Sequence, residues 1–302
     1  MKRLLNTLYI TSGNRYLSLD GENVVVMEDK KEIGRIPLHN LQAIVTFGYT
    51  GASPALMGAC AQRDIELSFM SGNGRFLARV SGEEKGNVTL RKTQYRISEK
   101  KEESVKIAKN FILGKVYNAR WVLERAARDY SMRLDAELLK KKSAFLGQSM
   151  NKIRECEDAG TLLGLEGEAA SVYFSAFDER ILQQKEDFYF HGRNKRPPLD
   201  NVNAMLSFGY SLLAGMCGGT LEAVGLDPYV GFFHTDRPGR MSLALDLMEE
   251  FRSVMVDRFV LTLINKRIMK PEYFLTKENG AVIMTEEGRK AFLSAWQGKN
   301  RR

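Results

Sequence analysis

Short runs of branched and aromatic residues, separated by turn-forming residues, fill the first eighty or so positions of the chain. The runs cover residues 4–10, 16–19, 24–27, 43–46, 66–70 and 76–80. Turn signals such as Asp20-Gly21 and the residues 71–74 lie between them, a pattern typical of β-strands. Ser53 and Pro54 have the preferences of a helix cap and a first turn, which predicts a helix over residues 55–63. We therefore predict a β-rich domain over residues 1–85.

From about residue 98 the apolar positions recur at intervals of three and four residues, as Ile107, Phe111 and Ile112 do, which is the period of a helix. The predicted helices cover residues 98–130, 132–158, 161–184, 202–223, 242–265 and 286–297. Asn279-Gly280, between two short apolar runs, predicts a hairpin. The fold class is therefore α+β: a small β-rich N-terminal domain, a linker over residues 86–97, and a larger, mostly α-helical domain over residues 98–302.

Composition narrows the class of protein. Hydrophobic residues make up 44% of the chain and charged residues 27%, which excludes intrinsic disorder. No stretch approaches the roughly 18 consecutive apolar residues of a membrane-spanning helix, so we expect no membrane association. Cys60, Cys156 and Cys217 are far apart and form no CxxC pair, which favours a reduced, cytoplasmic protein.

The positive charge is concentrated in one segment. Residues 91–142 contain 15 Lys and Arg but only 7 Asp and Glu, an excess equal to the net charge of +8 of the whole chain. A local positive field of this kind attracts polyanions, although a solvated helix surface has the same composition. Acidic residues interrupt the segment, which argues against a membrane surface and favours nucleic acid.

His234 has the most informative surroundings of the three histidines. It ends an apolar run and opens a loop, and the helix expected after that loop carries Asp246, Glu249 and Glu250 on one face. Three acids on a helix face are commonly in contact with solvent only. An imidazole and carboxylates that converge on one point, however, make a metal site.

A further carboxylate, Glu166, lies among apolar residues and between Gly164 and Gly167. Burying an unpaired charge is costly, so this side chain needs a partner. The partner is either an arginine or a metal ion. Glu168, two residues further on, is expected to be solvated.

A basic loop with two prolines precedes the helix that we expect to begin near Asp200. Arg193, Lys195 and Arg196 lie in this loop and can neutralise a phosphodiester. Tyr210, on the following helix, either stacks on a base or fills the core. Its apolar neighbours favour the core.

Three segments, in this order and at these spacings, carry a family resemblance. The segments are GLEGEAA, NKRPPLDNVNAMLSFGY and GFFHTDRPGRMSLALDLMEEFR. Together they resemble the CRISPR-associated integrase-endonuclease of the spacer-acquisition machinery, and the N-terminal part, around LHNLQAIVTFGYTGASPALMGACAQRDIELSFMSGNGRFLARVSG, is similar to the type I-C branch of that family. The resemblance implies a homodimer that associates with a small companion protein, captures DNA fragments and inserts them into a CRISPR array.

The resemblance also implies a set of site residues. The metal triad of the family falls on Glu166, His234 and Glu249, and its additional acid falls on Asp246. Two carboxylates and one imidazole favour Mg²⁺ or Mn²⁺ over structural zinc. The arginines and lysines expected to hold phosphates near the ion are Arg193, Lys195, Arg196, Arg237 and Arg240.

Two other functions remain open from the residues themselves. One is a non-catalytic nucleic-acid-binding scaffold in which the same residues form an inert charge cluster. The other is a metal-dependent nuclease of RNA or branched DNA without a role in integration.

Overall fold

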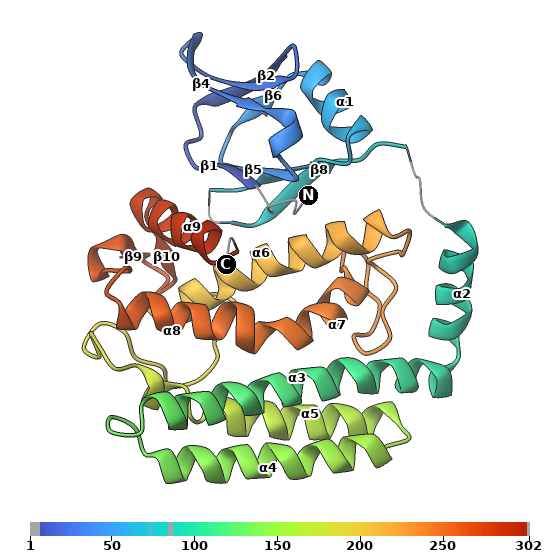
Figure 1. The fold of residues 1–302 in the computed structure, drawn as a ribbon, viewed down its shortest axis with the longest axis vertical. Coiled ribbons are helices and arrows are strands. Elements are labelled where there is room, and N and C mark those ends of the chain that lie inside the picture. Colours follow the sequence, from blue (N-terminus) through green and yellow to red (C-terminus); the bar gives the residue numbers. More distant parts are fainter. Residues whose placement is uncertain (1–6, 73, 84–86, 301–302) are drawn as a thin grey trace. The chain divides into compact units, whose positions relative to one another are not determined.

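The computed structural model describes residues 7–72, 74–83 and 87–300, which form two compact units. One unit consists of the N-terminal region up to Lys85, the stretch Glu272–Thr276 and the chain from Ile283 onwards. The other consists of Gly86–Pro271 and Lys277–Val282. The first is rich in strands and the second is mostly helical, so the predicted α+β class is confirmed (Figure 1).

The N-terminal unit contains two four-stranded sheets, with the strand orders β1-β5-β7-β8 and β4-β3-β2-β6. The strands are β1 (Thr7–Ile10), β2 (Arg15–Asp20), β3 (Asn23–Glu28), β4 (Lys31–Pro37), β5 (Ala43–Phe47), β6 (Gly51–Ala52), β7 (Glu66–Met70) and β8 (Phe76–Val80). A short 3₁₀ turn, η1 (Leu38–Asn40), precedes β5. Buried Leu17, Ile44 and Leu67 belong to one apolar core shared by strands of both sheets.

Local sequence signals explain several elements of this unit. Gly21 has a φ of 55° in the tight turn that joins β2 to β3, where Asp20 pairs with Asn23. Ser53 accepts a hydrogen bond from the backbone N–H of Leu56 and caps α1 (Pro54–Gln62), as predicted. Both signals act within a few residues of chain, which is why the sequence reveals them.

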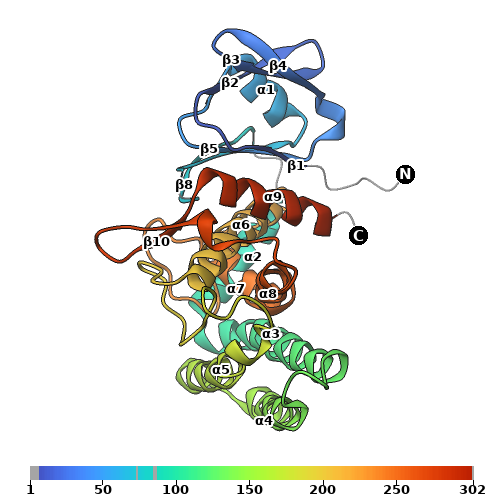
Figure 2. The ribbon, with the colours of Figure 1, turned by 90° about the vertical axis from the view of Figure 1, so that its left-hand side faces the viewer.

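The C-terminal helix, α9 (Glu286–Asn300), belongs to the N-terminal unit and not to the helical one (Figure 2). Gln297 donates a hydrogen bond to the carbonyl oxygen of Thr7, and Ser12 donates to Glu286 at 2.8 Å. Trp296 is fully buried. The expectation that one helical domain extends over residues 98–302 is therefore wrong at its C-terminal end, because this helix packs against strands almost 300 residues earlier in the chain.

The helical unit contains α2 (Val88–Glu99), α3 (Lys101–Asp129), α4 (Ala136–Glu155), α5 (Ala159–Phe174), α6 (Asn201–Ala223), α7 (Ser242–Phe251) and α8 (Arg258–Asn265). The long helix α3 lies beside α4 and α5 and also contacts α7 (Figure 1). Buried Ile112, Leu123 and Leu146 belong to the main core of this unit. Among the described residues, α6 alone is long and apolar enough to cross a membrane, but 61% of that stretch is buried, as expected of a core helix.

Two expectations about the helical unit need correction. Residues 86–97 are not a linker: α2 begins at Val88, and its buried Gln94 donates to the carbonyl oxygens of Asp227 and Val230, each at 2.8 Å. The helix expected over 161–184 ends at Phe174 and is followed by the 3₁₀ turn η2 (Asp178–Arg180). The Asn265 side chain hydrogen-bonds to the backbone on both sides of Ile181, which is extended and ends η2.

The helix expected over 242–265 is continuous but not uniform. A π-helical segment, η3 (Arg252–Asp257), separates α7 from α8. Insertions of this kind occur frequently at functional sites. Beyond it, η4 (Pro271–Tyr273) leads to β9 (Phe274–Thr276) and β10 (Val282–Met284), which pair as the predicted hairpin.

Replacing Trp296 by alanine tests the assignment of α9. We expect the free energy of unfolding of the N-terminal unit to fall by about 3–5 kcal/mol, because the change leaves a large cavity. Hydrogen exchange of the β1 and β5 amides, followed by mass spectrometry at increasing urea, measures this loss of stability as lower protection of those amides. Ser294→Ala, at an exposed position on the same helix, is the matched control. Equal protection in the two variants would contradict the assignment.

Candidate active site

A buried carboxylate, Asp246 on α7, organises the loop that carries His234. Its Oδ2 accepts the backbone N–H groups of Phe232 at 2.7 Å and Phe233 at 2.9 Å. Its Oδ1 accepts the backbone N–H of His234 at 2.9 Å and lies 2.7 Å from the imidazole Nδ1. Asp246 is fully buried, so these contacts replace all of its hydration.

Gly231 permits this close approach. A Cβ at that position would lie 2.7 Å from the Cβ of Ser242 and 3.0 Å from Oδ2 of Asp246. Any other residue would push the loop away from α7. Close packing against α7 therefore explains why the YVGFFH segment has a glycine at this position.

The contact with Asp246 determines which nitrogen of His234 is available. With Nδ1–H donating to the carboxylate, the lone pair of a neutral imidazole lies on Nε2. This Nε2 lies 3.9 Å from Oε1 of Glu249. Asp246 thus acts as a positioning residue, and His234 presents Nε2 toward the neighbouring acid.

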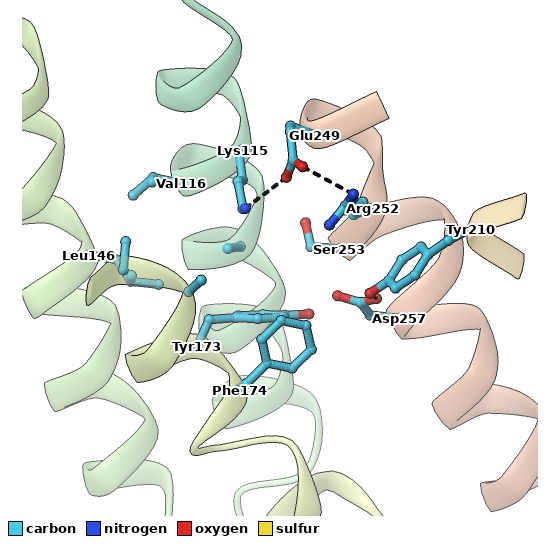
Figure 3. Close-up of a pocket in the computed structure, with 13 residues that line it drawn as sticks. Lys115, Val116, Leu146, Tyr173, Phe174, Tyr210, Glu249, Arg252, Ser253 and Asp257 are labelled. Atoms are coloured by element: carbon cyan, nitrogen blue, oxygen red, sulfur yellow. Dashed lines mark hydrogen bonds and ion pairs between the residues drawn. The ribbon is translucent and has the colours of Figure 1, made fainter. Parts of the chain in front are cut away.

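Glu249 and Glu166 converge on one cation, the ammonium of Lys115. Glu249 lies on α7, Glu166 on α5 and Lys115 on α3. The Lys115 Nζ contacts Glu166. It also lies 2.7 Å from Oε2 of Glu249, the contact drawn in Figure 3. The structure therefore brings the predicted Glu166, His234 and Glu249 together from three separate segments of the chain.

Arg252 in η3 is a second cation beside Glu249, with Nη2 3.1 Å from Oε1. Burial by itself would raise the pKa of Glu249, but the charges of Arg252, Lys115 and then His234 outweigh it. The pKa of Glu249 is therefore below its usual value. The carboxylate is held in the anionic form that binds a cation.

Glu250 has a different role from its neighbour. Its Cγ would lie 2.8 Å from a Cβ at Gly114 on α3, and its backbone oxygen accepts a hydrogen bond from Asn118 at 2.8 Å. These contacts place Glu250 at the junction of α3 and α7, away from the Glu249 carboxylate. Among the three acids of this helix face, Asp246 and Glu249 take part in the site and Glu250 does not.

The acids meet the requirements of a metal site only in part. No group of three His, Cys, Asp and Glu side chains among the described residues is already arranged around one point. The donor set nevertheless fits a divalent ion, because it consists of two carboxylates and the imidazole Nε2. An ammonium already lies between the carboxylates, so the position is one that a cation can occupy.

Tyr210 is not available to stack on a base. It is buried, and its hydroxyl donates to the buried carboxylate of Asp257. The guanidinium carbons of Arg193 and Arg252 lie 5.2 and 5.0 Å from the centre of its ring. The ring therefore supports two arginines, one of which contacts Glu249 (Figure 3).

The basic loop separates into two kinds of residue. Arg193 points inward and donates to the side chains of Asn203 at 2.5 Å and Ser207 at 3.1 Å, so it fastens the loop to α6. Lys195 and Arg196 are exposed. Partial loss of hydration, followed by the charges of Arg252, Arg193 and Arg196, lowers the pKa of Lys195.

The other bases expected to hold phosphates, Arg237 and Arg240, lie in the loop that His234 opens. Arg237 is exposed and Arg240 is partly exposed, close in sequence to His234. In the described part of the chain, no ion pair is formed by the side chains of Lys195, Arg196, Arg237 or Arg240. Their charges remain available to an anion.

The sequence analysis missed Lys115 and Arg252. Lys115 is a lone charge between Phe111 and Ala119 in an otherwise apolar stretch of α3, a signal that it needs an anionic partner. Arg252 follows Glu249 by three residues, a spacing that pairs side chains on a helix. Glu168, His39 and His191 are exposed and belong to no site described above.

Comparison with known proteins identifies the family. The model of the family described as CRISPR associated protein Cas1 matches residues 8–298. The chain belongs to the Cas1 family. It is an endonuclease with an integrase role in spacer acquisition, as the sequence resemblance predicted; the type I-C branch stays a prediction.

Curated relatives cover almost the entire chain. A CRISPR-associated endonuclease Cas1 from Rhodospirillum rubrum is 50% identical over 305 residues, covering 100% of this chain and 88% of the relative. One from Chlorobaculum tepidum is 46% identical over 297 residues, covering 98% and 87%. The solved structure of a casposase bound to integration product is also similar, with a TM-score of 0.82 and 25% identity, covering 97% of this chain and 82% of that one.

Replacing the two neighbouring acids of α7 separately tests the site. Glu249→Gln removes a carboxylate that faces Glu166, and we expect nuclease activity of this Cas1 chain to fall by about 100-fold or more. Glu250→Gln keeps the size of a side chain that packs against Gly114, and we expect activity within about threefold of the unchanged protein. Cleavage of labelled DNA measures both. Similar losses in the two variants would contradict the assignment.

Proposed function

We propose that this Cas1 chain cuts and joins DNA phosphodiesters at a divalent metal site held by Glu166, His234 and Glu249. The observation that carries the proposal is the convergence of the two carboxylates on one cationic position, with the oriented Nε2 of His234 beside it. Mg²⁺ and Mn²⁺ are the ions that suit this donor set. When bound, such an ion stabilises charge on the phosphate oxygens and lowers the pKa of the attacking hydroxyl.

The residues of the chain contribute orientation and charge. Asp246 holds His234 Nδ1 and keeps Nε2 directed at the site. Arg252, held against Tyr210, pairs with Glu249 and keeps that carboxylate anionic. In integration the nucleophile is the 3′-hydroxyl of the incoming DNA; in cleavage it is water. The same residues serve both reactions, because only the attacking oxygen differs.

The proposed substrates are double-stranded DNA fragments and the DNA of a CRISPR array. Support comes from the local excess of positive charge over residues 91–142 and from the exposed Lys195, Arg196 and Arg237 near the site. The similar casposase, whose structure is described as bound to integration product, also supports it. The homodimer, formed through the N-terminal domain, and the small companion protein are proposed from the family resemblance.

A strand-transfer assay tests the proposed function. Purified protein and its companion are given a labelled fragment and a supercoiled target, with and without Mn²⁺. We expect Glu166→Ala and His234→Ala to abolish joining while DNA affinity stays within about threefold, since neither residue is one of the exposed bases that are proposed to hold the phosphates. His39→Ala, which changes an exposed histidine of the other unit, is the control. Normal joining by His234→Ala would refute the site, and cleavage without joining would indicate a simple nuclease.

A comparison of two arginines in the basic loop separates phosphate binding from structure. Arg196 is exposed, and we expect Arg196→Ala to weaken DNA binding at all sequences and to reduce the salt-dependence slope by about one unit. Arg193 is largely buried and hydrogen-bonded, so we expect Arg193→Ala to lower the free energy of unfolding by about 2–3 kcal/mol. Fluorescence anisotropy at several salt concentrations and urea denaturation measure the two effects. Weaker DNA binding by Arg193→Ala, together with unchanged DNA binding by Arg196→Ala, would show that Arg193 binds the phosphate.

A further inference from the structure

Lys115 places a positive charge between the two carboxylates that we propose as metal ligands. Its ammonium contacts Glu166 and lies 2.7 Å from Oε2 of Glu249. The three side chains have exposed fractions of 15%, 17% and 4%, so water screens the contacts little. Val116 and Ala119, which follow Lys115 on α3, are buried and line the same pocket as the lysine.

The charges of this cluster are already balanced without a metal ion. Lys115 and Arg252 carry two positive charges, and Glu166 and Glu249 carry two negative charges. Asp246 is compensated separately by three backbone N–H groups and the imidazole of His234. Two carboxylates at one point would repel each other strongly without a cation between them. Lys115 supplies that cation.

The two cations differ in how they are held. Arg252 contacts the other oxygen of Glu249, Oε1, and its guanidinium also lies against the ring of Tyr210. Lys115, by contrast, makes polar contacts only with the two glutamates in the described part of the chain, and its ammonium is at the end of a flexible side chain. A divalent ion bound by the facing oxygens of Glu166 and Glu249 would take the position of the ammonium. Arg252 can remain where it is.

We propose that Lys115 is a built-in competitor of the divalent ion. It neutralises and holds the two ligands before the ion binds, and its ammonium leaves their shared position when the ion arrives. Lys115 thereby stabilises the protein without metal and lowers its affinity for metal. This inference rests on the proposed metal ligands, and it makes Lys115 a positioning residue whose effect is measurable without DNA.

Lys115→Met, which keeps the length of the side chain and removes its charge, is the direct test. We expect Mn²⁺ to bind at least about tenfold more tightly, because the ion no longer displaces a charge-assisted contact. Electron paramagnetic resonance of free Mn²⁺ in a titration measures the dissociation constant. We also expect a lower melting temperature without metal and a larger rise on adding Mn²⁺ than in the unchanged protein.

Matched variants separate competition from other effects. Lys106→Met removes an exposed lysine of the same helix and controls for the general loss of positive charge. Lys115→Arg keeps the charge, and we expect Mn²⁺ affinity no higher than in the unchanged protein. Lys115→Gln, a polar and uncharged replacement, gives the same tightening as Lys115→Met and replaces it should the methionine variant fail to fold.

The outcomes distinguish this inference from the proposed function. If Lys115→Met and Lys115→Gln both bind Mn²⁺ no more tightly than the unchanged protein, the proposed competition is overturned. A lysine that only packs against its neighbours, or that supports the bound metal, does not weaken Mn²⁺ binding, so removing its charge would not tighten it. Glu166→Gln checks the site itself: Mn²⁺ binding that is unchanged in this variant would refute the proposed ligands instead. Tightening in the two uncharged variants, lost again with Glu166→Gln, is the result that we expect.

Discussion

The bond between Asp246 and the His234 loop is the contact on which the rest of the site depends. Asp246 has no exposure to solvent, and its two oxygens accept three backbone N–H groups and face the imidazole. A buried carboxylate is stable only when such partners replace its hydration. The same contacts fix the path of the loop and the orientation of His234. The burial of one charge therefore determines which nitrogen the histidine offers to the site.

Around this contact the helical unit balances buried charges in pairs. Glu249 has Lys115 on one side and Arg252 on the other, and Arg252 lies against Tyr210. The hydroxyl of Tyr210 in turn donates to Asp257. Burial raises the pKa of Asp257, and its hydrogen bond with Tyr210 acts in the opposite direction without cancelling that rise. The π-helical segment η3 contains both Arg252 and Asp257, so the irregular turn supplies a cation to the Glu249 side and an acid to the Tyr210 side.

The balance of charge between Lys115, Arg252, Glu166 and Glu249 also affects the stability of the protein without metal. A site that is neutral before metal binds can keep its acids close together in a mostly buried environment, and the protein is not destabilised while it is unloaded. Exposed bases, Lys195 and Arg196 among them, form no ion pair with a carboxylate in the described residues, and we propose that they bind phosphate. Exposed positive charge of this kind suits a polyanionic substrate.

The sequence by itself determined the α+β class, most of the helices, the hairpin at Asn279-Gly280 and, through three motifs, the family and the members of the proposed triad. These features depend on local periodicity, on turn chemistry or on residue types at given spacings. Tertiary structure alone decided the rest: that α9 belongs with the strands, that α2 replaces a linker, that Tyr210 and Arg193 are internal supports, and that Lys115 lies between Glu166 and Glu249. Each of these depends on contacts between residues far apart in the chain, and no local pattern specifies which distant charge or surface a side chain will meet. Asp246 and Glu250 show the difference most clearly, because both are acids of one short helix and only packing against the His234 loop or against Gly114 separates their roles.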